Sequence, residues 1–190
     1  MPTPKLFLYK AAEANTVVLL RRGEKKDSWE MIRWDLETDT FTEGQWLLKK
    51  TINPAYCAIS PCGRFFAYHY DIYGFVKGEQ NYQSHNVVSA VPTFTALYFD
   101  GAALGHWDQL GFTESGELIS SRPMVKKGDV ELPFAPAAAS LAHSGYIGSL
   151  SEWTDPKGRE ITTQEGKLLA DGAILYDTTD HVFTPKAPVS

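Results

Sequence analysis

Short apolar runs separated by corners that contain glycine and proline set the pattern of this chain. The clearest example spans residues 55–71, where the run 55–59 stops at Ser60-Pro61-Cys62-Gly63 and the run 65–68 follows at once. Proline fixes φ for a turn and cannot donate to a strand ladder, while glycine adopts positive φ without steric cost. Two β-prone runs on either side of such a corner predict a β-hairpin.

The same pattern predicts strands along most of the chain. Four runs rich in β-branched and aromatic residues precede the first corner, at residues 5–10, 16–20, 29–36 and 41–48. Further strand-like runs follow it, at residues 86–91, 93–99, 104–107, 109–112, 117–120, 146–153, 159–162, 167–169 and 173–176. Only residues 137–143 favour a helix. We therefore expect one all-β domain that spans residues 1–190.

Three corners share one form and recur at similar intervals. Ser60-Pro61-Cys62-Gly63, Thr113-Glu114-Ser115-Gly116 and Asp155-Pro156-Lys157-Gly158 each begin with a small or acidic residue and end with glycine. A short strand follows each corner, and Asn15 can mark a degenerate first copy. Repeats of about 40–50 residues with four strands each are typical of β-propeller blades.

The segment AISPCGRFFAYHYD, at residues 58–71, resembles the segment that opens blades in WD40-like β-propeller proteins. The segment MIRWDLETDTFT, at residues 31–42, is similar to their third strand and turn, although the Gly-His element of WD40 repeats is missing. The resemblance covers about half of the chain. It implies a small propeller-like array of about four antiparallel blades, closed into a ring, closed differently, or paired with a second chain. A β-sandwich or barrel is the alternative fold.

Composition and charge narrow the class of protein. The 190 residues are 43% hydrophobic, 22% charged and 13% aromatic, which is typical of a globular protein and favours strands. The net charge of -5 argues against a nucleic-acid partner. No long apolar window or signal-peptide core is visible, so we expect a cytoplasmic protein that does not bind a membrane. Cys57 is interpreted as a core residue and Cys62 as a turn residue.

The run Tyr68-His69-Tyr70-Asp71 is the strongest candidate for chemistry. On a strand, His69 and Asp71 share one face, and a histidine beside a carboxylate can be oriented as a general base. This pair predicts a small enzyme of the hydrolase or lyase type. The simpler interpretation is that His69 satisfies the end of a strand and Asp71 begins a loop.

The other polar groups give weaker signals. Asp177, Asp180 and His181 can bind a cation, but a polar turn explains them better. Nucleotide-binding glycine loops, serine-hydrolase elbows and zinc-protease signatures are missing from the sequence. We therefore predict no metal site and no cofactor.

Residues 72–82 form a polar, aromatic insertion without a core period. Tyr73, Phe75 and Tyr82 lie within it, and Trp107 is a further aromatic candidate. Long aromatic loops on a β scaffold often bind partners, although these rings can also pack on their own domain. The main hypothesis is a binding or scaffold protein that presents such loops to a protein or small ligand. A third hypothesis is self-association into a homo-oligomer through exposed strand edges.

Overall fold

The computed structural model describes residues 3–76, 79–100, 109–135, 146–148 and 153–184. Within these residues the chain is all-β with antiparallel pairing, and one 3-10 turn, η1 (Pro54–Tyr56), interrupts the strands. The predicted all-β class is confirmed. In the described part of the chain, no helix is long and apolar enough to cross a membrane.

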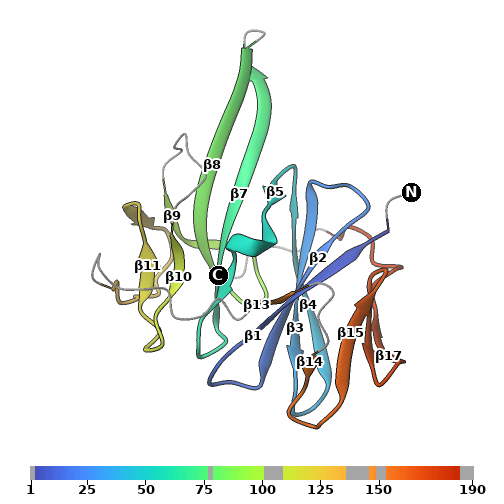
Figure 1. Ribbon diagram of the computed structural model, residues 1–190. Coiled ribbons are helices and arrows are strands. Elements are labelled where there is room, and N and C mark those ends of the chain that lie inside the picture. Colours follow the sequence, from blue (N-terminus) through green and yellow to red (C-terminus); the bar gives the residue numbers. More distant parts are fainter. Residues whose placement is uncertain (1–2, 77–78, 101–108, 136–145, 149–152, 185–190) are drawn as a thin grey trace.

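The strands form a central sheet and three further sheets (Figure 1). The central sheet has the order β13 (Tyr146–Gly148), β1 (Lys5–Lys10), β2 (Thr16–Arg22), β3 (Ser28–Asp35) and β4 (Thr40–Leu48). The arm sheet has the order β12 (Met124–Lys126), β9 (Ala96–Asp100), β8 (Glu79–Ala90), β7 (Phe65–Val76) and β5 (Thr51–Ile52), and β6 (Ala58–Ile59) also pairs with β7. The C-terminal sheet contains β14 (Trp153–Thr154), β15 (Glu160–Gln164), β16 (Lys167–Ala170) and β17 (Ala173–Asp177), and β10 (Leu110–Phe112) pairs with β11 (Leu118–Ser120).

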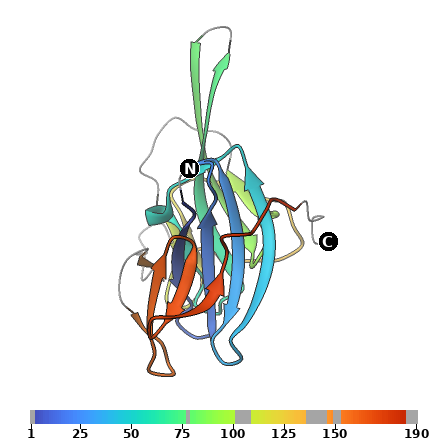
Figure 2. The same ribbon diagram turned by 90° about the vertical axis from the view of Figure 1, so that its right-hand side faces the viewer.

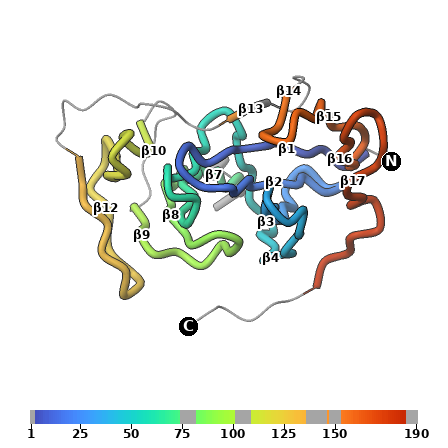
Figure 3. Tube along the Cα trace, turned by 90° about the horizontal axis from the view of Figure 1, so that it is seen from below, coloured from blue at the N-terminus to red at the C-terminus, as the bar shows by residue number. Residues whose placement is uncertain are grey.

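The sheets are stacked in layers, with the central sheet inside. Figure 3 shows β8 and β7 of the arm sheet, then the central sheet, then the C-terminal sheet, and Figure 2 shows the C-terminal sheet lying over the central one. The side chains of β2 show that the central sheet lies between the other two. Val18 and Leu20 face the arm sheet, while Val17 and Leu19 face the C-terminal sheet. A strand that is buried on both faces has a continuous apolar sequence, as TVVLL does.

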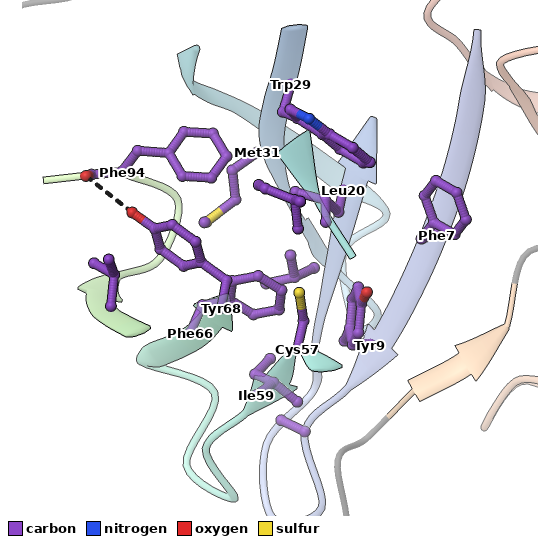
Figure 4. Close-up of a cluster of buried hydrophobic side chains, with 14 residues drawn as sticks. Phe7, Tyr9, Leu20, Trp29, Met31, Cys57, Ile59, Phe66, Tyr68 and Phe94 are labelled. Atoms are coloured by element: carbon purple, nitrogen blue, oxygen red, sulfur yellow. Dashed lines mark hydrogen bonds between the residues drawn. The ribbon is translucent and has the colours of Figure 1, made fainter. Parts of the chain in front are cut away.

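Aromatic side chains fill the layer between the central sheet and the arm sheet (Figure 4). The rings of Tyr9 and Phe66 meet edge to face, with their centroids 5.0 Å apart. The hydroxyl of Tyr68 donates to the carbonyl of Phe94 over 3.3 Å, so this buried phenol is not left without a partner. Cys57 is buried in the same cluster, as the sequence predicts.

The three predicted corners adopt the same turn. Gly63, Gly116 and Gly158 have φ of +72°, +84° and +79°. In each corner the glycine N–H donates to the carbonyl three residues earlier, over 2.9–3.0 Å. The three corners therefore share one turn geometry. The strands after the corners belong to different sheets, and the described residues do not show a closed ring or barrel.

The expectation of an irregular insertion at residues 72–82 is wrong. β7 and β8 continue through it as one hairpin, paired from Phe65↔Ala90 to Val76↔Glu79. The segment has no core period because its outer part projects beyond the sheets, where neither face is covered (Figure 1). The predicted helix at 137–143 and the predicted strand at 104–107 lie outside the described residues.

A partly exposed ion pair joins the C-terminal sheet to the central one. The two terminal nitrogens of Arg159 donate to the two carboxylate oxygens of Asp39 over 2.9 and 2.8 Å, and the indole N–H of Trp34 donates to the same carboxylate. The hydrogen bonds from Arg159 hold the pKa of Asp39 well below its usual value. A bidentate arginine–carboxylate pair has directional geometry, so it fixes how the two sheets meet.

Replacing Gly44 with alanine should destabilise the fold. Gly44 lies where the β3–β4 ladder shifts register, and a Cβ there would overlap the carbonyl oxygen of Pro92 and lie 2.5 Å from that of Met31. We expect Gly44→Ala to lower the free energy of unfolding in urea by about 2–3 kcal/mol. Gly116→Ala is the control, because no atom lies within 4 Å of its Cβ position and only the positive φ costs about 1 kcal/mol. Equal losses would contradict this account.

Asp39→Asn should destabilise the protein in a pH-dependent way. Asparagine also tolerates the φ of 54° at this position. Because the folded pKa of Asp39 is depressed, its stabilisation is present above the unfolded value of about 3.9 and is lost as the pH falls towards the folded value. We expect the urea unfolding free energies of wild type and variant to differ by about 1 kcal/mol at neutral pH and by less near pH 3. A difference that stays constant with pH, or that Glu37→Gln in the same turn reproduces, would refute the assignment.

Candidate functional site

A polar cluster lies at the base of the projecting hairpin. The β7–β8 register places His69 opposite Asn86, and Tyr73 opposite Tyr82, with Asp71 between them on the same face. These five residues form the Asp71 cluster. The lower part of this face is apolar and packs on β10–β11, so the face changes from a core to a polar surface at His69.

The cluster is closely hydrogen-bonded. Nδ1 of His69 lies 2.9 Å from Oδ1 of Asn86, and Nε2 lies 3.2 Å from Oδ1 of Asp71. Tyr82 donates to the same carboxylate over 2.7 Å, and Tyr73 donates to its other oxygen over 3.4 Å. His69 is only 5% exposed and Asp71 only 8%. Burial, followed by the hydrogen bond to Asp71, raises the pKa of Tyr82, which keeps this phenol protonated as a donor.

Asp100 and Arg122 extend the polar network. Oδ1 of Asp100 accepts a hydrogen bond from the backbone N–H of Asn86 over 2.6 Å, and Arg122 donates to Oδ2 over 3.1 Å. Arg122 also donates to the carbonyl of Ser84. Burial raises the pKa of Asp100, and the guanidinium of Arg122 works against that rise. The network thus ties β8 and β9 to the segment that precedes β12.

The structure brings the predicted pair His69 and Asp71 together on one face. Both ring nitrogens of His69 already have partners, so the present geometry leaves neither nitrogen facing a substrate. The arrangement can hold the base of the hairpin rigid. Catalysis by this pair stays a prediction.

The predicted partner-binding aromatics are only partly described. Tyr73 is 57% exposed and its ring lies 5.2 Å from that of Tyr82, which is partly buried. The backbone of Phe75 pairs with Gln80, but its side chain lies outside the described part. Trp107 also lies outside the described residues.

A groove at the opposite end of the sheets was not predicted. It has a volume of about 1000 Å³ and is lined by the β1–β2 turn, the Ser60–Gly63 corner and residues 130–133. The exposed Cys62 lies at its rim, 3.4 Å from Oγ of Ser60. Partial burial acts to raise the pKa of this thiol, but hydrogen bonds from Ser60 and Arg64 outweigh it and lower the pKa. Turns that are distant in sequence form this groove, so no local pattern could have indicated it.

A second unpredicted cluster contains Glu30 on β3, Glu43 on β4 and His181 after β17. Nδ1 of His181 lies 2.9 Å from Glu30 and Nε2 lies 3.6 Å from Glu43. The hydrogen bond to Glu30 raises the pKa of His181. Asp177, which was expected to share a polar turn with His181, accepts hydrogen bonds from Thr179 and does form such a turn.

Comparisons with known proteins give no relative: neither a family model, nor a curated protein, nor a solved structure matches this chain. The geometry of the arm and of the polar clusters is therefore the basis for any function of this chain.

The two tyrosines of the Asp71 cluster should contribute unequally to stability. Tyr82→Phe removes a 2.7 Å hydrogen bond to a buried carboxylate and should lower the urea unfolding free energy by about 1.5–3 kcal/mol. Tyr73→Phe removes a 3.4 Å bond at an exposed position and should cost less than about 0.5 kcal/mol. If the two losses were the same, the Asp71 carboxylate would not be the group that fastens the hairpin.

Proposed function

We propose that this chain is a binding protein whose β7–β8 arm contacts a protein partner. The arm consists of the hairpin beyond Asp71 on β7 and beyond Ser84, its paired residue, on β8. The observation that carries the proposal is its projection beyond every sheet of the described chain (Figures 1 and 2).

The arm leaves backbone groups available for pairing. β5 pairs with β7 only as far as Asp71, and β9 pairs with β8 only as far as Val87. The next backbone groups of β8, the N–H of Asn86 and the carbonyl of Ser84, are bound by Asp100 and Arg122. Towards the tip, β7 and β8 pair only with each other among the described strands. A two-stranded hairpin in water is only marginally stable, and its open edges can accept a further strand. A partner that adds a strand would stabilise the hairpin and would also pair with its open edge.

The base of the arm supports the same role. The Asp71 cluster fixes β7 and β8 where they leave the sheet, and the network of Asp100 and Arg122 fixes β8 to β9. A rigid base reduces the entropy that is lost when the arm binds. Tyr73 then provides an exposed aromatic ring just above this base.

A propeller-like scaffold is part of this proposal. The three glycine corners open hairpins in the arm sheet, in the β10–β11 sheet and in the C-terminal sheet. The C-terminal sheet packs on the central sheet, which is the first along the chain. This order is the one expected of blades placed around a centre. The arm would then be an extension of the second blade.

The enzymatic alternative has less support. It needs a nitrogen of His69 within reach of a substrate, and both nitrogens are engaged by Asn86 and Asp71. We therefore propose that His69 and Asp71 stabilise the base of the arm and do not act as catalytic residues.

A photo-crosslinking amino acid at position 73 tests the proposal. With p-benzoyl-phenylalanine in place of Tyr73, the folded chain should form defined adducts in an extract of its source organism. Ile174, on the C-terminal sheet, is 56% exposed and is the matched control position. Adducts should form from position 73 and not from position 174, and excess wild-type protein should compete for them. Adducts that contain two copies of the chain would identify the partner as a second copy.

Failure of the proposal has a clear signature. Equal adducts from both positions, or none from position 73 in a variant with wild-type stability, would show that the arm is not a binding surface.

A further inference from the structure

We propose that Glu30, Glu43 and His181 form a site for a divalent transition metal, with zinc as the best-fitting ion. The three residues come from β3, from β4 and from the turn that follows β17. This site does not depend on the function proposed for the arm.

The geometry of the three side chains suits one ion. One ligand atom from each residue can be chosen such that all three lie within 4.8 Å of one another. Zinc binds histidine nitrogen and carboxylate oxygen at about 2.0–2.2 Å, so its ligand atoms lie about 3–4 Å apart. In the present structure Glu30 lies at Nδ1 of His181 and Glu43 lies nearer Nε2, so binding one ion requires the side chains of Glu43 and His181 to rotate.

The buried carboxylate of Glu30 has one oxygen that could coordinate a cation. Glu30 is 1% exposed, and among the described residues one oxygen accepts a hydrogen bond from His181 while the other accepts none. A buried carboxylate is costly unless a cation or several donors compensate its charge. The charge of Arg21 compensates part of this cost, but only one oxygen of Glu30 accepts a hydrogen bond within the described chain, so the other can coordinate an ion.

Arg21 lies close by but is engaged with the backbone. Its Nε donates to the carbonyl and the hydroxyl of Thr178 over 3.1 Å, and Nη2 donates to the carbonyl of His181 over 3.3 Å. Arg21 is therefore a positioning residue that holds His181 over Glu30. Its charge opposes a metal ion, but the two carboxylates outnumber it.

The donor set selects the class of metal. An imidazole nitrogen with two carboxylate oxygens suits zinc and similar transition metals, whereas calcium and magnesium prefer oxygen ligands alone. The side chain of Glu43 is 52% exposed, so an ion can enter from solvent and keep a water ligand. A bound ion would join β3 and β4 to the turn after β17, and so fasten the C-terminal sheet to the central sheet.

Calorimetric titration of the full chain with zinc chloride tests the site. The protein carries Cys62→Ser, because this exposed thiol is a competing ligand. We expect one ion per chain with a Kd of about 1–10 μM, and a rise in Tm of a few degrees at saturating zinc. Cobalt(II) should give the visible absorption of a low-coordinate site without a thiolate charge-transfer band.

Isosteric variants assign the ligands. Glu43→Gln is at an exposed position and should fold normally, and both it and His181→Asn should weaken zinc binding by about tenfold or more. Glu30→Gln should do the same and should abolish the cobalt spectrum. Glu13→Gln, the same change at an exposed turn between β1 and β2, should leave the affinity unchanged.

Two results would overturn the proposal. One is the absence of binding heat and of any Tm shift up to about 1 mM zinc, which would leave an ordinary histidine–carboxylate contact. The other is an unchanged affinity in Glu43→Gln and His181→Asn, which would place the ion elsewhere.

Discussion

The need to bury both faces of the central sheet is the constraint on which this structure depends. Val17 and Leu19 on one face of β2 are as inaccessible as Val18 and Leu20 on the other. A sheet of this kind cannot face water on either side, so it requires a covering layer on each. The arm sheet and the C-terminal sheet meet this requirement. The position of every polar cluster then follows from where these layers end.

Apolar layers give stability but little orientation, because the hydrophobic effect is non-directional. Directional contacts lie at the ends of the layers. Arg159 binds Asp39 at one end of the C-terminal sheet, and Arg21 binds the backbone of Thr178 at the other. The arm sheet has its own fixed end at Asp71. Each covering layer is therefore attached by its core and oriented by a small number of charged groups.

Local features of this fold could be predicted from the sequence and distant ones could not. The four strands before the first corner and the three glycine turns depend on neighbouring residues, and they were predicted closely. His69 and Asp71 were placed on one face because residues two positions apart on a strand point to the same side. The arm was missed as a strand because a hairpin that projects beyond the other sheets has no hydrophobic alternation. The contact between Glu30 and His181 joins residues 151 positions apart, and a single sequence carries no signal for it.

The buried carboxylates differ in how many hydrogen bonds they accept. This difference distinguishes carboxylates that hold the fold from one that can bind a ligand. Asp71 accepts hydrogen bonds from two tyrosines and contacts His69, and Asp100 is bound by Arg122 and a backbone N–H. Each of these carboxylates has several partners, so both stabilise the base of the arm. Glu30 is as deeply buried but has only one hydrogen-bond partner in the described chain. Its unused oxygen makes the edge between the central and C-terminal sheets, and not the conspicuous His69–Asp71 pair, the place where this chain can bind an ion.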